Sequence, residues 1–175
     1  MSAVGAVVGN PKAKSRTLRF AEAVLSAAAD EAELAEDDRL TVDLADLGPQ
    51  LFDWSSAPVK EAVEGIQSCA LVVVASPTYK ASYTGLLKSF LDWFSTTDLL
   101  GVTVIPVMTG SGAHHALAVE VHLRPLLVEL GATLPTRGLY ITEGELARAD
   151  EVIADWRREA GPQLRRAVGA DRGIG

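Results

Sequence analysis

The sequence is short of several features, and each shortage excludes a class of protein. It contains one cysteine, Cys69, so an intramolecular disulfide cannot form. No group of cysteines and histidines has the spacing of a zinc site. A reducing compartment is therefore the expected environment.

Positive charge and long apolar runs are also scarce. The 175 residues carry a formal net charge of −7 with a pI near 4.9, so no broad basic surface is available for a nucleic-acid backbone. An apolar run of about 18 residues, which a membrane helix needs, occurs nowhere, and the sequence starts with no basic leader. We expect a cytoplasmic protein that binds neither nucleic acid nor membrane.

What the sequence does have is a regular alternation of short β-branched runs and helix-length segments. Strands are predicted at Ala3–Val8, Leu40–Leu44, Ala70–Ala75, Val102–Met108 and Thr133–Ile141. This alternation predicts an α/β fold, in which a five-stranded parallel sheet carries helices on both faces as a three-layer sandwich. The length fits a single domain, which we place at residues 1–169, followed by a flexible tail at 170–175.

The strands differ in a way that orders the sheet. Ala70–Ala75 is continuously apolar, as a strand covered on both faces must be, whereas Leu40–Leu44 alternates apolar and polar residues, as edge strands often do. The strand order 2-1-3-4-5 satisfies both patterns. Pro106, inside the fourth run, is expected where the strand pairing ends, because proline has no N–H to donate.

Two helices can be placed from their apolar spacing. Ser15–Asp30 repeats apolar residues at helical intervals, and the last helix carries a stripe that includes Ile153 and Trp156. Thr142 and Glu145 have capping-box spacing ahead of that last helix.

In such a sheet, ligands bind beyond the carboxyl ends of the strands where the strand order reverses, here between strands one and three. The loop Gly9–Thr17 leaves the first strand there and enters a helix, so its N–H groups, hydroxyls and helix dipole favour a phosphate. The alternative interpretation is an ordinary helix cap made by Ser15 or Thr17. A receiver domain would need acidic residues after the first strand, where Gly9 and Asn10 stand.

The scarce cations gather in the same loop. Lys12, Lys14 and Arg16 flank the predicted phosphate site. The loop differs from a Walker A motif, because the glycine before Lys14 and Ser15 is missing and the spacing is one residue short. Nucleoside triphosphate hydrolysis is therefore not expected.

Two further loops border the same crevice. Ser76–Gly85 combines a stiff Pro77 with tyrosines that could wall a planar ligand, or that could instead pack on the surface of a capping turn. Thr109–His115 offers glycines that let the chain pass close to a ring, or that form a simple turn. Its adjacent histidines do not converge on one ion, so no metal is expected.

On these loops the sequence resembles the NADPH-dependent FMN reductases of flavodoxin-like fold, most closely the alkanesulfonate-type two-component reductases. The matching segments are Gly9–Thr17, Ser76–Lys88, Thr109–Ser111 with His115, and Leu117–Pro125. The resemblance covers residues 3 to 142. The segment Ser76–Lys88 is the most specific part of the match.

The resemblance implies a set of FMN-binding residues and a reaction. Those residues are Gly9, Asn10, Pro11, Ser15, Arg16, Thr17, Pro77, Thr78, Tyr79, Lys80, Tyr83, Thr109, Gly110, Ser111, Gly112 and His115. Ser15, Arg16 and Thr17 would contact the phosphate, Pro77–Lys80 and Tyr83 would line the flavin ring, and Thr109–Gly112 would pass its other edge. A nicotinamide, from NADPH or NADH, would give a hydride to the flavin N5 atom, and no general base is assigned because the cofactor carries the chemistry.

The resemblance also implies a π-bulge in the fourth helix, at Val121 or His122. Pro125 lacks the N–H that would bond the Val121 carbonyl, so the helical hydrogen bonding is broken there in any case. His122 could fill the role of the inserted residue or could be an ordinary surface side chain.

The segment Gly85–Phe94 bears on assembly. Its apolar residues cover more of the helix than one sheet face can hide, so we expect a homodimer or homotetramer.

Several functions stay open at this point. The leading hypothesis is an NAD(P)H-dependent FMN reductase that supplies reduced flavin to a partner monooxygenase. The alternatives are an FMN-bound quinone or azo reductase, a flavodoxin-like electron carrier without nicotinamide activity, and a non-enzymatic domain that has lost its flavin.

Overall fold

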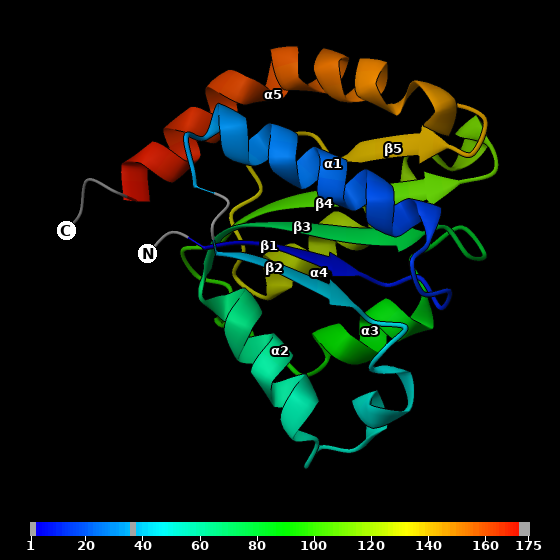
Figure 1. The fold of residues 1–175 in the computed structure, drawn as a ribbon, viewed down its shortest axis with the longest axis vertical. Coiled ribbons are helices and arrows are strands. Elements are labelled where there is room, and N and C mark those ends of the chain that lie inside the picture. The colour runs from blue at the N-terminus through cyan, green and yellow to red at the C-terminus, as the bar shows by residue number, and fades with distance from the viewer. Residues whose placement is uncertain (1–2, 36–37, 172–175) are drawn as a thin grey trace.

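The computed structural model describes residues 3–35 and 38–171 and contains a five-stranded parallel sheet in the order β2-β1-β3-β4-β5 (Figure 1). The strands are β1 Ala3–Val8, β2 Arg39–Asp43, β3 Cys69–Pro77, β4 Thr103–Gly110 and β5 Leu139–Thr142. The predicted α/β class and strand order are therefore confirmed. β3 is buried along nearly its whole length and β2, at the edge, is half-exposed, as their sequence patterns indicate.

Helices cover both faces of the sheet (Figure 1). The α-helices are α1 Arg16–Glu31, α2 Ala57–Gln67, α3 Gly85–Leu91, α4 Arg124–Glu129 and α5 Ala149–Asp171. Short 3₁₀ segments occur at Gly48–Phe52, Ala113–His115 and Leu146–Arg148. Helices α1 and α5 lie on one face, and α2, α3 and α4 lie on the other.

Each face has its own apolar core. On the α1/α5 face, Phe20 and Trp156 pack against the sheet, and the Trp156 indole N–H also donates to the Arg137 carbonyl at 3.1 Å. On the other face, Phe90 and Leu127 are fully buried. Burial of each such side chain stabilises the fold by about 1.5–3 kcal/mol, so both layers hold the strand ends in fixed relative positions.

The last predicted strand was too long at its start. Thr133 makes only an isolated bridge to Thr103, and β5 begins at Leu139. The carbonyls of Leu134 and Thr136 instead accept hydrogen bonds from the Arg124 guanidinium. The Arg124 side chain thus provides the hydrogen bonds that a neighbouring strand would otherwise give to these carbonyls.

Pro106 lies inside β4, opposite Val74 of β3. Pairing of β4 with β5 begins at the next residue, where Val107 faces Leu139. The expectation that Pro106 marks an end of pairing therefore holds on the β5 side but not on the β3 side.

The expected irregularity in the fourth helix is present as a π-helix at Val119–Leu123, which leads directly into α4. The carboxylate of Glu120 accepts hydrogen bonds from Arg124 and, at 2.6 Å, from the N–H of Gly138. Burial raises the pKa of Glu120, but these hydrogen bonds outweigh burial and leave that pKa below its usual range. The π-helix is thereby tied to the segment that precedes β5. His122 is exposed.

The start of α5 differs from the expected capping box. Glu145 does accept hydrogen bonds from the Thr142 N–H and hydroxyl, at 3.0 and 2.7 Å, but this closes a turn, and α5 begins only at Ala149. The helix runs to Asp171, and the rest of the expected tail, residues 172–175, lies outside the described residues. Within the described ranges, no helix is long and apolar enough to cross a bilayer.

The apolar helix α3 is mostly covered by its own chain. Phe90 and Phe94 are buried, and the Trp93 indole N–H donates to the Leu51 carbonyl at 3.0 Å. Trp54 packs on the Trp93 ring with centroids 4.7 Å apart. The reason given above for an oligomer is therefore wrong, because a segment after β2 hides this helix, and the oligomeric state stays a prediction.

Candidate functional site

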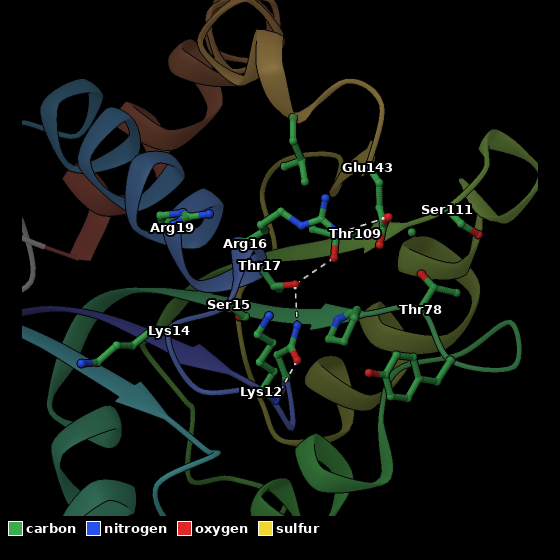
Figure 2. A pocket seen from close by; sticks show the side chains of 15 residues that line it. Lys12, Lys14, Ser15, Arg16, Thr17, Arg19, Thr78, Thr109, Ser111 and Glu143 are labelled. Atoms are coloured by element: carbon green, nitrogen blue, oxygen red, sulfur yellow. Dashed lines mark hydrogen bonds and ion pairs between the residues drawn. The ribbon is translucent and has the colours of Figure 1, made fainter.

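A cavity of about 700 Å³ opens at the carboxyl edge of the sheet (Figure 2). The loops that follow β1, β3, β4 and β5 line it, so it lies where the strand order reverses, as predicted. Its volume is in the range of pockets that hold small organic ligands.

Ten of the sixteen expected binding residues line this cavity. They are Asn10, Ser15, Arg16, Thr17, Pro77, Thr78, Tyr79, Thr109, Gly110 and Ser111. The flanking cations Lys12 and Lys14 line it too. Three lining residues were not predicted from the sequence: Arg19, Glu143 and Leu146.

One end of the cavity is the start of α1. Ser15 is its N-cap, with extended backbone geometry, and its hydroxyl oxygen accepts from the Leu18 N–H at 3.1 Å. The Arg19 N–H reaches the Ser15 carbonyl at 3.3 Å. Among the described residues, no acceptor is found for the N–H groups of Arg16 and Thr17, which are the first two of the helix. The capping interpretation is therefore correct, and two donors remain for an anion.

A chain of hydrogen bonds fixes this end to the rest of the sheet edge. The Asn10 amide donates to the Thr17 hydroxyl at 3.1 Å, and the hydroxyls of Thr17 and Thr109 are 2.9 Å apart. Thr17 and Thr109 are both buried. The loop after β1, helix α1 and the end of β4 are thus held in register by polar contacts at the cavity floor.

Four cationic residues line this end: Lys12, Lys14, Arg16 and Arg19. Figure 2 shows that the Lys14 side chain is directed away from that of Arg16. Arg16 forms an ion pair with Glu143, which follows β5, at 3.2 Å. Lys14 has a left-handed backbone conformation with φ of 53°, and its N–H donates to the Asp43 carboxylate at 3.0 Å. The positive charge and the helix dipole both favour an anion at this end of the cavity.

The opposite end is built by the turn after β3. The Thr78 N–H donates to the Thr109 carbonyl at 2.6 Å, and Tyr79 and Ser82 exchange backbone hydrogen bonds at 2.8 and 3.1 Å. The two residues between them, Lys80 and Ala81, have positive φ angles of 50° and 65°. This conformation is costly for residues with a side chain and is found preferentially at ligand sites. In this turn the Tyr79 side chain is exposed and lies at the rim of the cavity.

Tyr140 supports the floor between the two ends. Its hydroxyl donates to the Gly112 carbonyl at 2.8 Å, and a Cβ added at Gly110 would lie 2.0 Å from that hydroxyl. Burial raises the pKa of Tyr140, and a polar contact from Thr78 acts in the opposite direction. The Thr78 hydroxyl oxygen is buried and has no hydrogen bond of ordinary geometry within the described residues. It is therefore a polar atom that a ligand could satisfy.

Six expected residues do not line the cavity: Gly9, Pro11, Lys80, Tyr83, Gly112 and His115. For Gly9 the reason is packing, since an added Cβ would lie 2.5 Å from the Leu87 Cβ of α3. Tyr83 packs against the apolar core of the α3 face, and His115 packs against His114 at 4.0 Å between ring centroids. Their contact with a ligand stays a prediction.

Comparison with known proteins adds the family. A family model described as NADPH-dependent FMN reductase matches residues 2–145. The chain belongs to this family. The enzyme class predicted from the sequence, an NAD(P)H:FMN oxidoreductase, is confirmed with it, as is the family resemblance.

Individual relatives within the family are moderately similar. The NADH-dependent FMN reductase SfnF of Pseudomonas putida is 34% identical over 139 residues, which is 77% of this chain and 74% of that protein. The FMN reductase (NADPH) of Pseudomonas aeruginosa is 33% identical over 151 residues, 81% of this chain and 77% of that one. The apo crystal structure of NADH:FMN oxidoreductase (EMOB) is 31% identical, covers 98% of this chain and 89% of its own, and has a TM-score of 0.79.

The cavity is consistent with FMN as its occupant. A phosphate needs N–H donors, hydroxyls and a cation, which the start of α1 provides. Within the described residues, the buried Thr78 hydroxyl has no hydrogen bond of ordinary geometry, which leaves it for a ligand. Among the described residues, no group of three or more histidine, cysteine or acidic side chains is arranged to hold a metal ion.

Proposed function

We propose that this protein transfers a hydride from NADPH or NADH to FMN bound in the cavity at the carboxyl edge of the sheet. The observation that carries the proposal is the pairing of two unlike cavity ends. An anion site at the start of α1 faces an aromatic and backbone-rich rim after β3. FMN has the same two ends, a phosphate and a planar ring.

The phosphate would lie at the start of α1. Arg16 and Thr17 offer main-chain N–H groups, and Arg16 adds a guanidinium that can form charge-assisted hydrogen bonds. The hydrogen-bonded Asn10, Thr17 and Thr109 side chains keep these donors in place before the ligand arrives. Such preorganisation reduces the entropy cost of binding.

The ring would lie between the turn after β3 and the loop after β4. Tyr79 stands at its rim, and Thr78 and Gly110 lie on its floor. FMN bound there would supply the hydride acceptor for a reduced nicotinamide, and the residues around the ring would hold the two reactants together. Tyr140 is protonated at neutral pH, as an ordinary tyrosine with a pKa of about 10 is. Its hydroxyl therefore donates to the Gly112 carbonyl and holds that loop.

The finer parts of the proposal come from the family resemblance. The reduced flavin would be handed to a separate monooxygenase, and the protein would work in the cytoplasm as a homodimer or homotetramer. Three exposed apolar side chains support such an assembly: Leu117, just before the π-helix, Val121 within it and Val128 in α4.

The test is an assay of the purified protein for a flavin absorption band and for oxidation of NADPH and NADH, with and without added FMN. We expect turnover that requires added FMN. A tightly yellow protein without nicotinamide oxidation would instead identify an electron carrier. A yellow protein that needs a quinone or azo acceptor, rather than free FMN, would identify the other alternative.

A further inference from the structure

The cavity contains a carboxylate where an anion should bind. Glu143, the first residue after β5, lines the end that is otherwise cationic (Figure 2). We infer that Glu143 lowers the affinity for the FMN phosphate, by pairing with Arg16 and by repelling the phosphate, and so keeps the flavin exchangeable. This inference rests on the proposed function and concerns how FMN is bound rather than whether it is reduced.

The position of the carboxylate is specific. A Glu143 oxygen lies 3.2 Å from an Arg16 terminal nitrogen, and Figure 2 shows the two side chains reaching toward each other from the loop after β5 and from α1. Within the described part of the chain, Glu143 is the only acidic residue that lines the cavity, beside four cations. A phosphate that takes Arg16 must therefore displace this partner.

The backbone under Glu143 is braced. The Glu143 N–H donates to the Gly110 carbonyl at 2.8 Å, which fixes it to the end of β4. Glu145 closes the turn around it, because its N–H reaches the Thr142 carbonyl at 3.0 Å and its carboxylate accepts from the Thr142 hydroxyl and N–H. The hydrogen bonds from Thr142 lower the pKa of Glu145. That carboxylate is therefore charged, and it is already bonded to Thr142. The turn thus presents the Glu143 side chain to the cavity and keeps Glu145 out of it.

A role in stability does not account for the pair. Both side chains are more than half exposed, at 56% for Arg16 and 55% for Glu143, and ion pairs so open to water stabilise proteins little. The pair matters more for a bound ligand, because a phosphate monoester carries about −1.5 to −2 charges at neutral pH. Removal of one nearby negative charge should change its affinity by about threefold to tenfold.

The experiment compares dissociation constants of FMN and riboflavin for wild-type protein and Glu143→Gln. Riboflavin has the same ring without the phosphate, so it reports any effect on the ring end. Glu151→Gln is the matched control, since it makes the same charge change at an exposed α5 residue outside the cavity. Each constant is measured at low salt and at about 1 M salt, where the screening length is about 3 Å.

We expect Glu143→Gln to tighten FMN binding about threefold to tenfold at low salt, to change riboflavin binding less than about twofold, and to lose most of the gain at high salt. In an Arg16→Ala background the gain should shrink, because Arg16 is no longer there to be released. Glu151→Gln should leave both flavins unchanged.

Several results would overturn the inference. These are unchanged or weaker FMN binding by Glu143→Gln, an equal change for both flavins, or the same gain in Glu151→Gln. An undiminished gain in the Arg16→Ala background would contradict the competition for Arg16. If neither flavin bound the wild-type protein, the proposed function and the inference would both fail. The other results would overturn the inference alone, because wild-type protein would still bind FMN.

Discussion

The two ends of the cavity are built in different ways. The end at α1 is made from a helix start that Ser15 caps, and a chain of hydrogen bonds from Asn10 through Thr17 to Thr109 ties that start to β4. The end after β3 is a tight turn with two residues at positive φ and an exposed tyrosine. One end is a preformed polar site, and the other is a surface shaped by strained backbone.

This difference predicts that the α1 end binds the phosphate and the β3 end binds the ring. Substitutions at the α1 end should discriminate between flavins with and without a phosphate, because the contacts there are electrostatic. Substitutions at the β3 end should affect both flavins alike, because a ring wall contributes through packing. Four experiments can break or sharpen this comparison.

Gly9→Ala should have the largest effect, a loss of about 3 kcal/mol in the free energy of unfolding. The new Cβ would lie 2.5 Å from the Leu87 Cβ and 3.1 Å from its Cα, so α3 would have to move away from the end of β1. Urea denaturation measures the loss. Gly85→Ala is the control, since nothing lies within 4 Å of an added Cβ there. Equal stability of the two variants would show that α3 does not press on the start of the phosphate loop.

Arg16→Ala should weaken FMN binding by about 1–3 kcal/mol, the usual range for a charge-assisted hydrogen bond. Riboflavin binding should be unchanged, and isothermal titration calorimetry of both flavins checks this. An equal loss for the two flavins would contradict a phosphate at the α1 end.

Ser15→Ala and Thr84→Ala form a matched pair of cap removals. Ser15 caps α1 through the Leu18 N–H and Thr84 caps α3 through the Leu87 N–H, each at 3.1 Å. Ser15→Ala should cost about 1 kcal/mol of stability. Thr84→Ala should cost more, because the buried Thr84 hydroxyl also donates to the Gly9 carbonyl at 2.6 Å. Only Ser15→Ala should also weaken FMN binding, because Thr84 does not line the cavity. Thermal unfolding and flavin titration of both variants separate the two roles.

Tyr79→Ala should have the smallest effect, a loss of about 0.5–1 kcal/mol in binding. FMN and riboflavin should lose equally, since Tyr79 stands at the end away from the cations. Its side chain is exposed, so the midpoint of urea unfolding should stay unchanged. A loss confined to FMN would place the phosphate at the wrong end of the cavity.

The fold could be predicted from the sequence because its signals are local. The continuous apolar run of β3 and the alternation in β2 order the sheet, and Pro125 indicates the irregular helix before it. The start of β5 could not be predicted, since Arg124 takes the backbone carbonyls that a neighbouring strand would otherwise bond. That contact depends on tertiary structure.

The same distinction holds for the site. Arg19 was missed although it lies three residues after Arg16 on α1, a spacing that places two side chains on one helix face. Glu143 had a weaker signal, since it follows a strand that does not border the crevice, and only the fold brings it to Arg16. The contact of Gly9 with FMN stays a prediction, and the structure adds a second reason for a glycine there, since an added Cβ would lie 2.5 Å from the Leu87 Cβ of α3.

The central claim is that FMN binds with its phosphate at the start of α1 and its ring between the loops after β3 and β4. A crystal structure of the protein with FMN tests it most directly. We predict phosphate oxygens within hydrogen-bonding distance of the Arg16 and Thr17 main-chain N–H groups, with the ring beside Thr78, Tyr79 and Gly110. A phosphate bound anywhere else, or a ring seated over Arg16, would contradict it.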